Sequence, residues 1–295
     1  MKKILLLLMI ASASLGWSQQ VRVTSTTRLL PERAAFYPSL SSDGSRLLFS
    51  DADAHGLKML DIATSMETTV SNRDGAGFDA KWGNDGNIYY VTSEINSSDR
   101  LVYRTGRRYN LDTRSSEVIL EPQHGAVHLT TGQQGLAMKG EKHSYAASPQ
   151  GGASVYTTGA QLVVNINGKE NRYSPVESYA GYLWSSISPS ADKIAFFAAG
   201  RGIIVTDLEG KVLAQLGNYE MPCWYNNDYI VAQNATDDGY QFTSSQIMLL
   251  KADGSFRYEL TPSTSMTMQP TCGGGKIAYT TIDGLLSLIT IDIDE

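Results

Sequence analysis

The sequence has few of the residues that usually carry catalysis or bind metals. Only 2 of its 295 residues are cysteines and only 4 are histidines. It contains no Gly-x-Ser-x-Gly elbow, no His-Glu-x-x-His motif, no Cys-x-x-Cys pair and no glycine-rich phosphate loop. These absences exclude the serine hydrolases, zinc peptidases and P-loop proteins that such motifs identify, and we predict neither a cofactor nor a metal.

Positive charge and long apolar segments are also scarce. The 24 Lys and Arg residues are outnumbered by 30 Asp and Glu residues, which gives a formal net charge of −6. Binding to phosphates needs concentrated positive charge, so nucleic acid is not an expected partner. The apolar run Ile4–Ile10 is too short to span a bilayer, and we expect a protein that does not cross a membrane.

The first 18 residues have the pattern of a secretory signal peptide. Lys2 and Lys3 precede the apolar run, and small residues follow it up to Ser18. We predict cleavage after Ser18 and a periplasmic or secreted protein. The remainder, residues 19–295, is predicted to form a single domain.

A repeated pattern of turn and apolar strand runs through that domain. Its clearest copies are Tyr37–Phe49 and Ser185–Phe197. Strand and turn signals alternate throughout the domain, and we find no convincing long amphipathic helix. Stacked copies of one small unit predict a repeat architecture. We expect an all-β fold with six units, the third being degenerate and carrying an insertion. The units cover about 35–72, 77–122, 123–178, 182–217, 219–265 and 266–295.

The sixth unit is one strand short, whereas Val21–Leu30 forms an extra strand before the first unit. Open sheet edges favour aggregation, so a ring of sheets needs to close. We therefore predict a six-bladed β-propeller closed by pairing of Val21–Leu30 with the strand that ends near Asp294.

The segment Pro38-Ser39-Leu40-Ser41-Ser42-Asp43-Gly44, followed by an apolar strand, resembles the WD40-like repeat of the six-bladed TolB-type propellers. Pro222 and Pro270 occupy the position of Pro38, and Trp82, Ile187 and Trp224 occupy that of Leu40. The resemblance implies an exported propeller that binds a partner. TolB itself has an additional α/β domain before its propeller, and we expect this chain to lack it.

Aromatic and polar residues stand at the predicted entry to each innermost strand. Tyrosine is frequent, with 16 residues against 7 phenylalanines, and tyrosine is favoured at binding surfaces. In a propeller these entries surround one mouth of the central pore. Packing at the blade edges is an equally good explanation for any one of them. The predicted ligand-binding residues are Tyr37, Asp79, Tyr182, Glu220 and Gln269.

Two other groups of polar residues are weaker candidates. His124 and His128 lie in a predicted strand, where residues four apart are separated by ~13 Å, too far to share one metal. Asp51 with Asp53, and Asp237 with Asp238, fit no calcium-loop pattern. We interpret these aspartates as solvated turn residues.

The two cysteines, Cys223 and Cys272, fall on the innermost strands of the fifth and sixth units. Cys223 is one residue after Pro222 and Cys272 is two residues after Pro270, so the two side chains are expected to point to opposite faces of their sheets and toward each other. We predict a disulfide, since thiols of exported proteins tend to oxidise. The alternative is two unrelated buried cysteines that pack as small apolar groups.

Two functional classes remain open from the sequence. The first is a non-enzymatic binding or scaffold protein for an envelope protein, a peptide or a glycan. The second is a propeller hydrolase or lyase that acts on polysaccharide or peptide, since propeller enzymes can recruit acids from different blades. Converging carboxylates with strongly shifted pKa values would indicate the enzyme.

Overall fold

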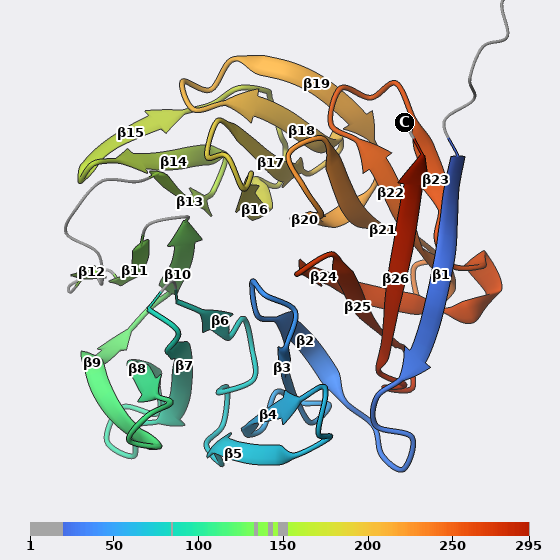
Figure 1. Cartoon of the computed structure of the whole chain (residues 1–295). Coiled ribbons are helices and arrows are strands. Elements are labelled where there is room, and N and C mark those ends of the chain that lie inside the picture. Colours follow the sequence, from blue (N-terminus) through green and yellow to red (C-terminus); the bar gives the residue numbers. More distant parts are fainter. Residues whose placement is uncertain (1–19, 84, 133–134, 141–143, 147–152, 295) are drawn as a thin grey trace, which may run out of the picture.

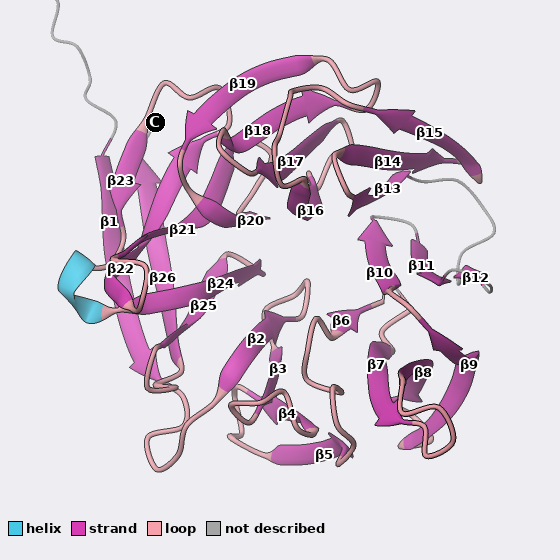
Figure 2. Cartoon of the chain, turned by 180° about the vertical axis from the view of Figure 1, so that it is seen from behind, coloured by secondary structure: helices cyan, strands magenta, loops and turns pink. Residues whose placement is uncertain are grey.

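The computed structural model describes residues 20–83, 85–132, 135–140, 144–146 and 153–294. The predicted signal peptide lies outside these residues. The described part is built from β-strands with a single 3₁₀ turn, η1 (Ser263–Ser265), at the periphery (Figure 2). No helix in the described part is long and apolar enough to cross a membrane.

The small sheets are arranged in a ring around a common centre (Figure 1). In each regular blade the strands follow one another outward in chain order, so a short hairpin connects each strand to the next. The first blade contains β2 (Phe36–Leu40), β3 (Arg46–Ser50), β4 (Leu57–Asp61) and β5 (Glu67–Ser71). The second contains β6 (Lys81–Trp82), β7 (Ile88–Ile95), β8 (Val102–Asn110) and β9 (Ser115–His124).

The fourth and fifth blades follow the same plan. The fourth consists of β16 (Tyr182–Ile187), β17 (Lys193–Ala198), β18 (Gly202–Asp207) and β19 (Val212–Gly217). The fifth consists of β20 (Glu220–Trp224), β21 (Tyr229–Asp237), β22 (Phe242–Lys251) and β23 (Arg257–Glu259).

The sixth blade contains strands from both ends of the described chain. It is formed by β24 (Thr267–Gly273), β25 (Lys276–Thr281) and β26 (Ser287–Asp294), with β1 (Gln20–Arg28) as its outermost strand. β1 pairs antiparallel with β26 from Gln20 opposite Asp294 to Arg28 opposite Ser287. The predicted closure is therefore confirmed.

The third blade is irregular, and its strands divide into two small sheets. One contains β10 (Val127–Gly132), β11 (Gly135–Gly140) and β12 (Ser144–Ala146), and the other β13 (Ala153–Thr158), β14 (Gln161–Ile166) and β15 (Lys169–Tyr173). The described strands thus form seven hydrogen-bonded sheets. The count of six blades holds with these two sheets taken together as the third blade.

A backbone contact that recurs between blades shows how β13–β15 relate to the regular blades. The amide of Tyr182 donates to the carbonyl of Gly159 (2.7 Å), between β13 and β14. In the first blade Gly77 N donates in the same way to Ala54 O (3.1 Å), in the loop between the second and third strands. By this contact β13–β15 correspond to the second, third and fourth strands of a blade, and β10 precedes them as the first.

The hydrophobic core is divided among the spaces between blades. The buried hydrophobic residues of the described chain form six clusters, each between two consecutive blades. The cluster between the fifth and sixth blades, for example, joins Val231 and Leu249 to Ile277 and Ile289, and includes Val21 of the closing strand. Six clusters around a ring confirm the predicted six-bladed propeller.

The two ends of the blades differ, and we name them for the connections they carry. The turn face has the hairpins between first and second strands (including 41–45, 188–192, 225–228 and 274–275) and those between third and fourth strands. The loop face has the connections between second and third strands (such as 51–56, 96–101 and 238–241) and those between blades (such as 72–80 and 174–181).

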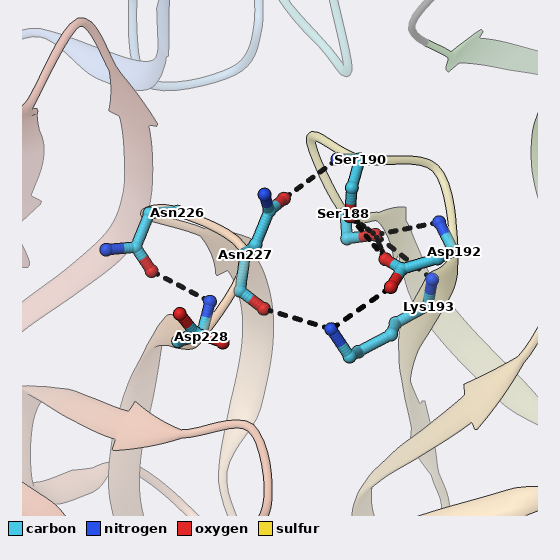
Figure 3. A network of polar contacts seen from close by, with 7 residues as sticks. All are labelled: Ser188, Ser190, Asp192, Lys193, Asn226, Asn227 and Asp228. Carbon is cyan, nitrogen blue, oxygen red and sulfur yellow. Dashed lines mark hydrogen bonds and ion pairs between the residues drawn. The ribbon is translucent and has the colours of Figure 1, made fainter.

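Hydrogen bonds within and between neighbouring hairpins organise the turn face. Figure 3 shows this for the fourth and fifth blades, where Ser190 N donates to Asn227 Oδ1 (2.8 Å) and Lys193 Nζ donates to Asn227 O (3.4 Å). Asp192 accepts hydrogen bonds from the hydroxyls of Ser190 and Ser188, and these lower the pKa of its carboxyl, with the Ser190 bond as the largest cause. The two hydrogen bonds to Asn227 link the hairpin of the fourth blade to that of the fifth.

Candidate functional site

The innermost strands share an irregularity at their loop-face end. In β2 the residue pair Phe36–Ser50 is followed by Ser39–Leu48, so the inner strand contains one residue more than its neighbour. The same bulge occurs in β16, β20 and β24. Bulges of this kind are frequent beside active sites, where they redirect side chains.

Each of these bulges contains a non-glycine residue in the left-handed backbone region. Tyr37 has φ 53°, Trp184 φ 50°, Met221 φ 51° and Gln269 φ 55°. Asp79, just before β6, has φ 56°. Such a conformation costs an L-residue roughly 1–2 kcal/mol, and residues of this kind gather at functional sites. Five blades thus carry the same strained position near the centre of the ring.

Glutamine side chains support two of these positions from the preceding blade. Tyr37 N donates to Gln269 Oε1 (2.8 Å), and Gln269 N donates to Gln233 Oε1 (3.0 Å). Gln233 is buried on β21. These bonds connect the fifth, sixth and first blades in sequence, so the strained backbone is held by the ring itself.

A cavity of about 690 Å³ opens on the loop face above the second blade. Its wall combines the Tyr37 bulge, the 51–56 loop, the loop before β6, the loop-face ends of β7 and β8, and the start of β10. This volume falls in the range of small-molecule sites. The lining residues are Tyr37, Ala52, Asp53, Ala54, Gly75, Phe78, Asp79, Val91, Ser93, Arg104, Gly125, Ala126, Val127 and Leu129.

The cavity wall offers both apolar rings and charged groups. The rings of Tyr37 and Phe78 meet edge to face, with centroids 5.9 Å apart, and Phe78 is 64% exposed. The Asp79 carboxylate forms an ion pair with Lys81 (2.7 Å), and Arg104 Nη1 donates to the Gly125 carbonyl (2.8 Å). An exposed aromatic ring beside oriented polar groups can stack on a flat ligand and also fix its orientation.

The five predicted ligand-binding residues have different surroundings. Tyr37 and Asp79 line the cavity together. Gln269 supports the backbone of Tyr37, as described above. Tyr182 is only 2% exposed, and its hydroxyl bonds to the backbone of Val176, so its side chain packs inside the fold.

Glu220 is the fifth of these residues and lies apart from the residues that line the cavity. It is half-buried on β20, next to the bulge. Burial, with a smaller contribution from Asp237, raises the pKa of its carboxyl. No group of three or more His, Cys, Asp or Glu residues suited to a metal occurs in the described part of the chain.

The two histidines do not share a strand as the sequence predicted. His124 ends β9, Gly125 turns with φ 101°, and His128 belongs to β10 in another sheet. The turn interpretation applies well to Asp238, because the amides of Tyr240 and Gln241 (both 2.9 Å) donate to its carboxylate and lower its pKa.

Sequence reasoning missed the residues that are equivalent to Tyr37 in the fourth and fifth blades. Because the bulge contains one extra residue, these are Trp184 and Met221, not Tyr182 and Glu220. A signal was present: Tyr37 lies three residues before Leu40, and the same step back from Ile187 and Trp224 reaches Trp184 and Met221. Phe78 directly precedes the predicted Asp79 in the sequence. Arg104 gave no comparable signal, because it reaches the cavity from a different segment of the chain.

Exposed hydrophobic side chains are concentrated on the loop face. Of fourteen large hydrophobic residues that are exposed in the described chain, ten lie in loop-face connections or at the strand ends next to them. The ten are Phe78, Ile95, Leu101, Val102, Tyr179, Leu183, Trp184, Tyr240, Phe242 and Ile282.

Comparisons with known proteins support the fold. No family model and no curated protein matches the sequence. Among solved structures, TolB from Acinetobacter baumannii aligns with a TM-score of 0.50 and 15% identity over 76% of this chain and 53% of that one. The chain thus spans about half the length of that TolB structure. The fold is that of a TolB-like β-propeller, as the sequence resemblance implied.

Two other solved structures are similar over more of their length. An oligogalacturonate lyase in complex with manganese aligns with a TM-score of 0.53 and 15% identity, over 90% of this chain and 80% of the other. A chain of the Mitotic Checkpoint Complex aligns with a TM-score of 0.58 and 10% identity, over 98% and 99%. At these identities the likeness concerns the fold alone.

Proposed function

We propose that the protein is a non-enzymatic binding or scaffold protein that acts in the periplasm or outside the cell. It binds an envelope protein, a peptide or a glycan on the loop face, with the cavity above the second blade as the principal contact. The observation that carries this proposal is the coincidence of the cavity, the strained Tyr37 and Asp79 positions and the exposed apolar residues on one face. The TolB-like fold supports the same class of function.

The cavity is suited to binding without catalysis. Two of the three charged residues that line it already have partners: Asp79 pairs with Lys81 and Arg104 donates to the Gly125 carbonyl. Such groups are held in position to receive a ligand. Exposed Phe78 adds an apolar contact of the kind that dominates binding energy at interfaces.

The test compares two variants that alter equally exposed hydrophobic residues on opposite faces. Phe78 (64% exposed) is on the loop face, and Met66 (59%) is on the turn face, in the hairpin between β4 and β5. Three mature proteins are screened on glycan and peptide arrays and by cross-linking in envelope extract: the wild type and the variants Phe78→Ser and Met66→Ser. We expect a ligand retained by Met66→Ser and lost by Phe78→Ser. Equal binding by the two variants would contradict the loop-face assignment.

The location is tested separately. Cell fractionation should recover the protein outside the cytoplasm, and sequencing of its amino terminus should begin at Gln19. A cytoplasmic protein that retains Met1 would refute the exported location and leave the cavity assignment untouched.

A propeller hydrolase or lyase is the second candidate. The pKa of the Glu220 carboxyl is raised by burial and, to a smaller extent, by Asp237. A raised pKa favours the protonated form, which a general acid needs. The oligogalacturonate lyase among the similar folds belongs to this class. Incubation with polysaccharides, uronides included, and with peptides distinguishes the two. Cleavage that Glu220→Gln abolishes would establish the enzyme.

A further inference from the structure

Two thiols face each other across the boundary between the fifth and sixth blades. Cys223 lies on β20 and Cys272 on β24, the innermost strands of these blades. Their Sγ atoms are 2.7 Å apart, although the two residues are 49 positions apart in sequence. They are the only cysteines of the chain.

The strand register explains why the two sulfurs meet. Cys223 pairs with Val231, directly after the bulge of β20, whereas Cys272 pairs with Ile277, one position further along the equivalent bulge of β24. Successive strand residues point to opposite sides of a sheet. This single-residue offset turns Cys223 toward the sixth blade and Cys272 toward the fifth, as the sequence pattern predicted.

We propose that Cys223 and Cys272 form a disulfide that joins the fifth blade to the sixth in the mature protein. Closing the sulfur pair from 2.7 Å to a bond of about 2.05 Å requires a movement of about 0.65 Å, which side-chain rotation can provide. The oxidant is an external disulfide, carried by a protein or by a small thiol compound.

The reaction is a thiol–disulfide exchange in two steps. One cysteine loses its proton and attacks a sulfur of the external disulfide, which releases the first external thiol. The second cysteine then attacks the mixed disulfide, which forms the Cys223–Cys272 bond and releases the second thiol. The two cysteines lose two electrons and two protons, and the external disulfide gains both.

The surroundings of the pair affect how fast this reaction occurs. Both cysteines pack against the hydrophobic cluster between the fifth and sixth blades. Burial, reinforced by the neighbouring Cys223, raises the pKa of the Cys272 thiol well above its ordinary value. Thiolate is the attacking species, so this shift slows attack by the Cys272 thiol in the folded chain.

The position of the bond gives it a specific role in the ring. The sixth blade is the one that depends on β1, a strand from the opposite end of the chain. A covalent link between β20 and β24 holds this blade to its neighbour in the unfolded chain as well as in the folded one. Restricting the unfolded chain in this way disfavours unfolding.

The test begins with mature protein refolded in a mixture of oxidised and reduced glutathione. It is then unfolded without reductant in the presence of an alkylating reagent. We expect no alkylated cysteine, and a proteolytic digest that contains a peptide pair joined through Cys223 and Cys272. Two alkylated cysteines per chain would overturn the proposal.

A stability measurement provides an independent check with a matched control. Reduction should increase the unfolding equilibrium constant of the wild type on the order of 10²-fold, and leave that of the double variant Cys223→Ser/Cys272→Ser unchanged. An equal response of the two proteins to reductant would overturn the proposal.

Discussion

The two faces of this propeller are built from the same repeat and use it differently. On the turn face, short hairpins satisfy their own polar groups, as Asp43 does by accepting from Ser41 Oγ (2.6 Å) and Ser45 N (3.0 Å). On the loop face, the connections are longer, the backbone is strained at Tyr37 and Asp79, and hydrophobic side chains are exposed. Under the proposed function, the turn face contributes to stability and the loop face binds the ligand.

The largest expected effect concerns the turn face at the boundary between the sixth and first blades. A Cβ on Gly274 would lie 2.1 Å from the carbonyl oxygen of Asp43, whereas a Cβ on Gly275 would meet nothing within 4 Å. Both glycines have positive φ, so both alanine variants share that strain. We expect Gly275→Ala to lose about 1 kcal/mol and Gly274→Ala about 3 kcal/mol or more.

Denaturant unfolding of the two variants measures the difference. The comparison isolates the clash with the backbone of the first blade, because φ strain is common to both. Equal losses would show that the turns of the sixth and first blades are not packed as closely as the structure indicates.

The next effect contrasts two leucines of equal exposure on the two faces. Leu183 (47% exposed) lies at the loop-face start of β16, and Leu213 (48%) lies near the turn-face start of β19. We expect Leu183→Ser to weaken binding of the array-identified ligand ~10-fold, which corresponds to about 1.4 kcal/mol, and Leu213→Ser to leave it unchanged. Titration calorimetry measures both. Weaker binding by Leu213→Ser would break the division between the faces.

A smaller effect is expected where a tryptophan bonds to the preceding blade. Trp82 Nε1 donates to Ser39 O (2.9 Å), and Trp224 Nε1 donates to Ser186 O (3.1 Å), both just before a turn-face hairpin. Replacement by phenylalanine removes the donor, and we expect each variant to lose about 1 kcal/mol.

The two tryptophans are far apart in the ring, so the losses should add in the double variant Trp82→Phe/Trp224→Phe. Ligand binding should stay the same. A double variant as stable as the wild type would mean that these bonds do not stabilise the blade boundaries.

The smallest effect is electrostatic and depends on pH. Hydrogen bonds from Ser41 and then Ser45 lower the pKa of Asp43 from 3.8 to about 2. The folded state therefore favours the ionised carboxylate, and this contribution is present above the unfolded pKa and is lost as the pH falls toward the folded value. Asp43→Asn should be slightly less stable than wild type near neutral pH, and the gap should shrink as the pH falls from about 4 to about 2. Because Asp43 is exposed, the effect is small. A gap that does not change with pH would refute the electrostatic origin.

The sequence was informative wherever structure depends on local pattern. The turn after Pro38 and the apolar strand after it recur at a regular spacing, which is why the blades and the missing sixth-blade strand could be predicted. The prediction that the Cys223 and Cys272 side chains point toward each other needed only the alternation of side chains along a strand. These features need only the period of a strand and the position of its turns.

The candidate site was only partly predictable because it depends on distant segments and on a bulge. Tyr37 and Asp79 were predicted and both line the cavity. In the fourth blade the extra residue of the bulge shifts the position equivalent to Tyr37 to Trp184, so Tyr182 is not its equivalent. Arg104 enters the cavity through pairing of β8 with β7. In the third blade β10 pairs with β11 and not with β13, so the blade divides into two sheets of consecutive strands, and the sequence pattern did not indicate this division.

The pairing of β1 with β26 has a mechanical consequence. Gln20 lies opposite Asp294, so the two described ends of the chain leave the ring side by side, from the same edge of one blade. A force that pulls these ends apart loads the β1–β26 ladder from that edge and opens one residue pair after another. The propeller therefore has low mechanical resistance to this force, although its hydrophobic core is buried all round the ring, because the β1–β26 pairing can be separated pair by pair.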